Sequence, residues 1–194
     1  MCCVCYNRIN SHDEEYIMSE KRLKSTLKYA CSFLELYEDH VELSDHKTAS
    51  RVVIKHVGGA SVLPLTSDNK VILTTQYRYP INQLSIEIPA GKRDFIEEDG
   101  LSCAKRELEE ETGYQSDHFE HYMTFFPCVG YSDEKLDIFI AKNCYRVINP
   151  RRMDEDENIS IMILDKQEVK KLLHDGRISD GKTIIALQHY LVNL

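Results

Sequence analysis

The most informative stretch of the chain covers residues 91–114 and reads GKRDFIEEDGLSCAKRELEEETGY. Its second half predicts a helix over 101–112, because apolar residues recur there at helical spacing. These residues are Leu101, Ala104 and Leu108. Asp99 or Ser102 can cap the start of this helix, and Gly113 supplies its stop. The apolar side of the helix is therefore expected to pack in a core, and the acidic side faces away from it.

The acidic side of this helix carries a cluster of glutamates. Each helical residue advances by about 100°, so Glu107, Glu110 and Glu111 fall within one arc of about 100°, whereas Glu109 points elsewhere. Carboxylates on a shared face repel one another and cost helix stability when nothing neutralises them. A hard divalent cation relieves that repulsion, because it takes oxygen ligands and shares them with substrate phosphates. A solvated acidic face is the alternative interpretation.

The stretch resembles the sequence box of the Nudix hydrolase family, G-x5-E-x7-R-E-U-x-E-E-x-G-U with U bulky and apolar, which residues 106–114 match in full in its second half. Glu98 also stands at the family's spacing from Arg106. Gly91 lies one residue too far from Glu98, but this insertion falls in a strand-to-helix loop, where extra length costs little. The resemblance implies an α+β fold, the Nudix α/β/α sandwich, with a mixed sheet between helices.

The resemblance also implies roles for the residues of the box. The ligands of Mg²⁺ or Mn²⁺ would be the carboxylates of Glu107, Glu110 and Glu111, together with the backbone carbonyl of Ala90. Glu98 and Arg106 would form a salt bridge that braces the loop against the helix and orients the ligands. Bound metal ions would activate water and neutralise the phosphate oxygens. A carboxylate would then accept the proton, and Glu111 is one candidate for that base.

Further stretches resemble the ADP-ribose pyrophosphatase branch of this family. They are residues 76–80, followed by 87–92, then 130–134 and 153–159. The resemblance covers about three quarters of the chain, from Arg51 to the C-terminus. It implies hydrolysis of ADP-ribose to AMP and ribose 5-phosphate. Val129 stands where many members of the branch have proline, so other nucleoside diphosphate sugars, such as UDP-glucose or GDP-mannose, remain alternatives.

The same branch implies candidate residues outside the box. Its acidic loop supplies the catalytic base, and both Glu155 and Glu157 hold suitable positions in this chain. The candidates for substrate binding are Arg51, Arg78, Glu87 and Glu134. The two arginines suit phosphate oxygens or the terminal ribose, because a guanidinium offers a fork of N–H donors. For each of these side chains, an ordinary surface role is the alternative.

Pattern and composition divide the chain into three parts. Residues 1–25 are polar and irregular and are expected to form an N-terminal tail. Residues 26–57 are expected to form a β-extension, with a hairpin that turns at 38–40 and a strand at 51–56. Residues 58–194 are expected to form the Nudix domain. Because such extensions exchange between subunits in the resembling branch, the resemblance implies a homodimer.

Composition and charge restrict the possible partners and the compartment. The net charge of −8 gives a nucleic acid no electrostatic help, and no apolar run is long enough to span a membrane. The N-terminus does not resemble a secretory signal. The seven cysteines are odd in number and mostly scattered, which favours reduced thiols in the cytoplasm. The cluster of Cys2, Cys3 and Cys5 lacks the second pair of a structural zinc site.

Two other kinds of protein remain possible on the sequence. A house-cleaning hydrolase of oxidised nucleoside triphosphates would share the box, but it would release pyrophosphate rather than a sugar phosphate. A binding module that kept the Nudix fold without catalysis should tolerate the loss of the box carboxylates. An unused acidic face would carry a cost in repulsion without any return, which favours an enzyme.

Overall fold

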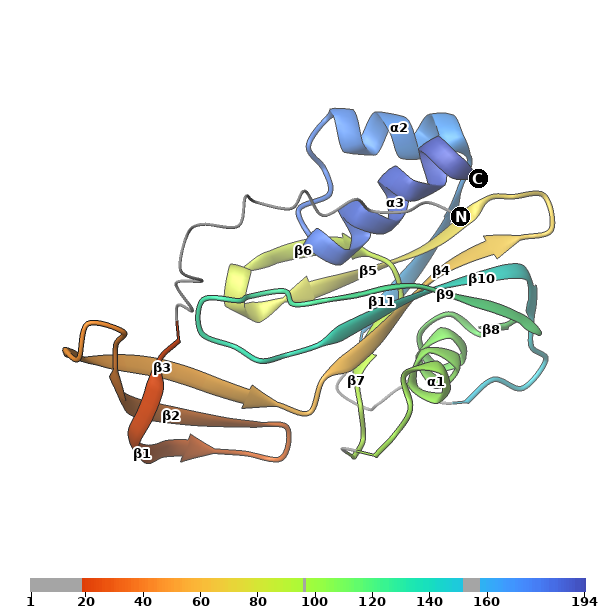
Figure 1. Ribbon diagram of the computed structural model, residues 1–194. Coiled ribbons are helices and arrows are strands. Elements are labelled where there is room, and N and C mark those ends of the chain that lie inside the picture. The colour runs from red at the N-terminus through yellow and green to blue at the C-terminus, as the bar shows by residue number, and fades with distance from the viewer. Residues whose placement is uncertain (1–18, 96, 152–157) are drawn as a thin grey trace, which may run out of the picture.

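The computed structural model describes residues 19–95, 97–151 and 158–194, which form a small antiparallel sheet and a large mixed sheet with helices. The small sheet has the strand order β1-β2-β3. Its strands are β1 (Lys21–Ala30), β2 (Leu34–Glu42) and β3 (Thr48–His56). Figure 1 shows this sheet, in red and orange, at one side of the molecule, and β3 leads from it into the large sheet.

The middle strand of the small sheet differs from the sequence-based expectation. The expected turn at 38–40 is wrong, because these residues lie within β2 and pair with both neighbouring strands. Asp39 is buried there and accepts a hydrogen bond from Ser25 Oγ, so its carboxylate is satisfied inside the sheet. The connections lie instead at 31–33 and 43–47. The tail boundary at residue 25 is also wrong, since β1 begins at Lys21.

The large sheet has the central strand order β11-β5-β4-β10-β8, and β6, β7 and β9 pair with β5, β4 and β10. Its strands are β4 (Gly59–Thr66), β5 (Val71–Arg78), β6 (Gln83–Glu87), β7 (Ala90–Lys92), β8 (Tyr114–Gln115), β9 (His118–Phe125), β10 (Leu136–Arg146) and β11 (Ile159–Leu164). The pairing of β4 with β10 is parallel, whereas the other pairings of the sheet are antiparallel. The sheet is therefore mixed, as predicted.

Helices cover both faces of the large sheet (Figure 1): α1 (Gly100–Thr112) on one face, and α2 (Lys166–His174) and α3 (Gly181–Asn193) on the other. Alternation along the strands divides the core, because neighbouring residues point to opposite faces. The core beside α1 includes Val62, Ile72, Leu108 and Phe139. The core beside α2 and α3 includes Leu63, Leu73, Ile138 and Leu187. This arrangement confirms the predicted α/β/α sandwich.

Hydrogen bonds join the small sheet to the loop that precedes β10. The Ile54 N–H donates to the Tyr131 carbonyl at 2.7 Å, and the Asp133 N–H donates to the Ile54 carbonyl at 3.1 Å. The Asp133 carboxylate also pairs with Lys55 at 2.7 Å. Residues 131–133 therefore extend the edge of β3. Within the ranges that the structure describes, no helix is long and apolar enough to cross a membrane.

Candidate active site

The helix α1 begins at Gly100, one residue before the predicted start, and ends at Thr112 as predicted. The Asp99 carboxylate accepts hydrogen bonds from the backbone N–H groups of Leu101 and Ser102, each at 3.0 Å. Gly113 ends the helix with a φ of 70°, in the left-handed region that glycine adopts without strain. The buried Ala104 and Leu108 pack into the core. The helix is thereby held in one rotation, which turns its acidic side toward β7.

Two box glutamates lie against the backbone of β7. Glu107 is only 8% exposed, and a Cβ added to Gly91 would lie 1.8 Å from Glu107 Oε1. The Ala90 N–H donates to Glu111 Oε2 at 3.2 Å, and Glu111 is 6% exposed. The structure thus brings together Ala90, Glu107 and Glu111, which the sequence selects as metal ligands, and Gly91 provides the space for one of these carboxylates.

Arg106 connects the other acidic residues of the box. Its Nη1 donates to Glu107 Oε1 at 2.7 Å and to Glu110 Oε2 at 3.1 Å, and its Nε contacts Glu98 Oε1 at 3.3 Å. Glu98 Oε2 accepts from the Asp94 N–H at 2.8 Å, which holds the loop that contains the extra residue. Burial lowers the pKa of Arg106, but its hydrogen bonds to Glu98 and the charge of Glu107 raise that pKa overall, so the guanidinium stays charged.

The donors on this side of α1 suit a hard divalent cation. They are carboxylate oxygens next to the β7 backbone, and Mg²⁺ and Mn²⁺ prefer oxygen ligands. Arg106 already engages one oxygen of Glu107 and one of Glu110. Among residues 19–95, 97–151 and 158–194, no three His, Cys, Asp or Glu side chains are gathered in a metal-holding arrangement. The oxygen donors therefore fit the cation by chemistry, and Arg106 contributes positive charge beside them.

Arg78 and Glu87 form a second charged group, between β5, β6 and α3. Glu87 is 5% exposed and accepts from Arg78 Nε at 2.8 Å, from Arg78 Nη2 at 2.9 Å and from Lys182 Nζ at 2.5 Å. Burial raises the pKa of Glu87, but the hydrogen bonds and charges of Arg78 and Lys182 lower it to about 2. A cavity of about 520 Å³ opens beside these three residues. Glu87 is therefore an ionised carboxylate that orients Arg78.

Sequence reasoning missed Lys182, because it lies 95 residues from Glu87. Its only sequence signal is its place directly after Asp180-Gly181, where α3 begins. Helical periodicity predicts the helix but says nothing about which strand its first turn contacts.

Two further candidates, Arg51 and Glu134, have ion-pair partners outside the α1–β7 contact. Arg51 is on the small sheet, where its guanidinium pairs with Glu20. Glu134 is half-buried, and its Oε1 lies 3.7 Å from His56 Nδ1 at the junction of the two sheets. Glu155 and Glu157 lie outside the described residues.

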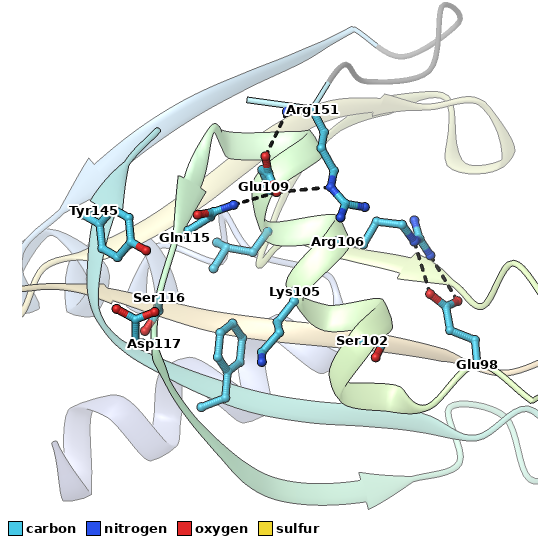
Figure 2. A pocket seen from close by; sticks show the side chains of 12 residues that line it. Glu98, Ser102, Lys105, Arg106, Glu109, Gln115, Ser116, Asp117, Tyr145 and Arg151 are labelled. Atoms are coloured by element: carbon cyan, nitrogen blue, oxygen red, sulfur yellow. Dashed lines mark hydrogen bonds and ion pairs between the residues drawn. The ribbon is translucent and has the colours of Figure 1, made fainter. Parts of the chain in front are cut away.

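A second overlooked residue is Glu109, on another side of α1. Figure 2 shows it at a cavity of about 430 Å³, pointing toward Gln115 and Arg151. It is 8% exposed, and its oxygens accept hydrogen bonds from the Arg151 backbone N–H and from Gln115 Nε2. The helical arc correctly separates Glu109 from the other box glutamates. Its partner at Arg151 lies 42 residues further on, so the local pattern could not identify it.

Comparisons with known proteins agree with this fold. Residues 55–187 match the family model of the NUDIX domain. The chain is 34% identical to the methanol dehydrogenase activator of Bacillus methanolicus, over 89% of this chain and 93% of that protein. It is 33% identical to the ADP-ribose pyrophosphatase of Bacillus subtilis, over 89% and 92% of the two chains.

A solved structure described as an ADP compounds hydrolase has the same fold, with a TM-score of 0.78 and 17% identity, and the match covers 90% of this chain and 94% of that one. The similarity to the ADP-ribose pyrophosphatase branch that the sequence indicates is thereby confirmed. The chain therefore belongs to the Nudix family, and it is a pyrophosphohydrolase of that family.

Proposed function

We propose that the chain hydrolyses the diphosphate of ADP-ribose to AMP and ribose 5-phosphate with the help of Mg²⁺ or Mn²⁺. The observation that carries this proposal is the packing of two buried box carboxylates, Glu107 and Glu111, against the backbone of Ala90 and Gly91. The choice of ADP-ribose is supported by the stretches at 76–80 and 87–92 and by the name of the relative from Bacillus subtilis.

The box residues are proposed to bind and orient. Glu107, Glu110 and Glu111 are proposed as ligands, with the carbonyl of Ala90. Metal ions held there would supply an activated water and neutralise charge on the diphosphate. Arg106 and Glu98 keep the carboxylates and the preceding loop in place, which is the role that supporting residues have at metal sites.

The attacking water must lose a proton, so a general base is needed. Glu155 and Glu157 are proposed for this role, and Glu111 is the third candidate. A carboxylate on the acidic segment can act as the base without giving up a position as a metal ligand, which favours the first two residues over Glu111.

Arg78 is proposed to contact the substrate beside the cavity of about 520 Å³. Glu87 accepts from its Nε and Nη2, which fixes the plane of the guanidinium. Glu134 is also proposed to contact the substrate. Arg51 lies on β3 of the small sheet, and the homodimer that the resemblance implies is proposed to bring it to the site of a second copy.

A cytoplasmic location is proposed from the cysteines. Cys31, Cys103, Cys128 and Cys144 are free thiols, which suits a reducing compartment. Burial raises the pKa of Cys103 and Cys144 to about 12, so both thiols stay protonated and do not act as nucleophiles.

A substrate panel tests the proposed reaction. The full chain is incubated with ADP-ribose, GDP-mannose, UDP-glucose and an oxidised nucleoside triphosphate, each with Mg²⁺, with Mn²⁺ or with a chelator. Products are identified by mass. We expect AMP and ribose 5-phosphate, with the highest kcat/KM for ADP-ribose and no product with chelator.

The other outcomes identify the alternatives. A higher kcat/KM for GDP-mannose or UDP-glucose, which Val129 keeps open, would replace the substrate but keep the reaction class. Pyrophosphate from the oxidised triphosphate would indicate a house-cleaning enzyme. No product from any compound with either metal would contradict hydrolysis and favour a binding module.

A further inference from the structure

Lys182 is a nearly buried cation to which the proposed reaction assigns no role. It lies in the first turn of α3, and its side chain is only 12% exposed. Its Nζ is 2.5 Å from Glu87 Oε2 and 3.0 Å from Asp180 Oδ2. Removing an ammonium from water is unfavourable, and a buried ion pair by itself is weak evidence for a stabilising role. A role for Lys182 beyond fixing α3 to the sheet is therefore expected.

The carboxylate that Lys182 contacts already has a cationic partner. Arg78 donates from Nε to Glu87 Oε1 at 2.8 Å and from Nη2 to Glu87 Oε2 at 2.9 Å, a geometry in which one guanidinium satisfies and neutralises a carboxylate. Lys182 approaches the same Oε2 as Arg78 Nη2. Two cations therefore share one buried carboxylate, and the second cation allows the first to direct part of its charge toward another anion.

The cavity of about 520 Å³ offers a place for that anion, because Arg78, Glu87, Asp180 and Lys182 all line it. The side chain of Arg78 is 39% exposed, whereas Lys182 is mostly covered, so Arg78 is the more accessible of the two cations. The hydrogen bond to Glu87 raises the pKa of Arg78, and the charges of Glu87, Glu111 and Asp180 raise it further against the opposing effect of burial. Arg78 is therefore close enough to Glu111, a proposed metal ligand, to sense its charge.

We propose that Lys182 is a positioning residue, which balances the charge of Glu87 and thereby keeps the Arg78 guanidinium available to an anionic diphosphate. This inference rests on the proposed function. The charges of Arg78 and Lys182 balance those of Glu87 and Asp180. Without Lys182 the group would carry a net negative charge, which repels a diphosphate and leaves Glu87 to engage Arg78 alone.

Three variants separate the charge of Lys182 from its packing. Lys182→Met removes the charge and keeps an unbranched apolar side chain, whereas Lys182→Arg keeps the charge. Lys182→Met combined with Asp180→Asn removes one charge of each sign, so the group returns to neutrality, and asparagine can still cap α3. Lys142→Met is the matched control, because Lys142 forms an exposed ion pair of 3.0 Å with Glu120 on β9, away from this cavity.

We expect Lys182→Met to raise KM for ADP-ribose about 5- to 30-fold at low salt while kcat changes less than about 3-fold, because the lost attraction acts on bound substrate and transition state alike. Added salt should reduce this difference in KM, since it screens the unbalanced charge. Lys182→Arg and the double variant should keep KM within about 3-fold of the wild type. A purely structural role predicts no such recovery, because the double variant loses a second charged contact of α3.

Two results would overturn the inference: a KM of Lys182→Met equal to that of Lys142→Met, or a double variant whose KM is no lower than that of Lys182→Met. Calorimetric titration of the same variants with ADP-ribose in the presence of a chelator separates this failure from failure of the proposed function. Hydrolysis with a KM and an affinity that do not depend on Lys182 would refute the inference alone. An affinity that depends on Lys182 in a chain without hydrolysis would refute the reaction and keep the role of Lys182 in binding. A chain that neither hydrolyses nor binds ADP-ribose would refute both.

Discussion

Gly91 is the residue at which the backbone of β7 and a box carboxylate come closest. Any side chain there would overlap Glu107, since even a Cβ would lie 1.8 Å from Oε1 and 2.6 Å from Oε2 of that carboxylate. Close approach of a carboxylate to a strand backbone requires glycine. The glycine of the sequence box therefore has a steric role that is independent of loop length, and the extra residue between Gly91 and Glu98 leaves this contact intact.

Replacing Gly91 with alanine tests this steric role. We expect Gly91→Ala to displace the Glu107 carboxylate and to lower the affinity for Mn²⁺ and the rate of diphosphate hydrolysis, each about 10- to 100-fold. Gly130→Ala is the matched control, because a Cβ there meets no atom within 4 Å. Titration of Mn²⁺ followed by steady-state kinetics gives both values. Equal Mn²⁺ affinities and equal rates for Gly91→Ala and Gly130→Ala would show that metal binding and hydrolysis do not depend on the position of the Glu107 carboxylate.

Sequence reasoning at this scale succeeded for residues whose partners are local. The helical arc predicted that Glu107 and Glu111 lie on one side of α1, and the family resemblance implied the contact between Glu98 and Arg106, which is 3.3 Å. It could not predict that Lys182 binds Glu87 or that Arg151 binds Glu109. Those contacts depend on how elements distant in sequence pack together.

The elements around Glu87 show how a buried ion group joins two strands and a helix. Arg78 ends β5, Glu87 ends β6 and Lys182 lies in the first turn of α3. A neighbouring contact has the same function, since the Ile88 N–H donates to the buried Thr183 Oγ1 at 2.9 Å. The first turn of α3 is therefore fixed to the strand end that precedes Ala90, one of the proposed metal ligands.

The pH dependence of stability tests the ion group. The pKa of Glu87 falls from 4.5 to about 2 on folding, so the unfolded chain binds a proton between these values that the folded chain does not. The stabilisation is complete above pH 4.5 and is lost as the pH falls toward 2. We expect the stability difference between wild type and Glu87→Gln to shrink by about 3 kcal/mol over this range.

Urea unfolding at a series of pH values measures this difference. The exposed Glu120→Gln variant serves as the control, and its stability should follow that of the wild type throughout. A difference between wild type and Glu87→Gln that stays constant from neutral pH to the acid limit would refute the lowered pKa.

The element that the sequence misjudged most is β2. The polar run at 38–40 resembles a turn, but strands pair with it on both sides, and Ser25 satisfies Asp39 inside the sheet. A central strand can hold a charged residue when a neighbouring strand supplies a donor. Helix α1 was easier to predict, because its apolar periodicity and its cap Asp99 agree.

At the scale of the whole molecule, the small sheet exposes large apolar side chains. Leu23, Leu27, Tyr29 and Val52 are each more than half exposed. They lie on both faces of the sheet, because Leu27 is level with Tyr37 and Val53, whereas Val52 is level with Glu38 and Thr26. The family resemblance predicted the layers around the large sheet. The hydrogen bonds between the small sheet and residues 131–133 join backbone groups, so the pattern of side chains could not predict where the small sheet lies.

The assembly is tested by mass measurement over a range of concentrations. We expect the full chain to form a dimer of about twice the chain mass of 22.5 kDa. Leu27→Glu with Val52→Glu should shift it toward the monomer and raise KM, because Arg51 would then be absent from the partner's site. Val192→Glu is the control, as Val192 is 80% exposed on α3. A wild-type chain that stays monomeric would contradict both the dimer and the role of Arg51.

The central claim is that the carboxylates between α1 and β7 form the reaction centre. The most direct measurement is the rate of ADP-ribose hydrolysis at saturating Mg²⁺ for Glu107→Gln and Glu111→Gln, compared with Glu120→Gln. We expect each of the first two changes to lower the rate by at least about 100-fold, while the control keeps the wild-type rate and all variants stay folded. Folded Glu107→Gln and Glu111→Gln variants with the rate of the control would contradict the claim.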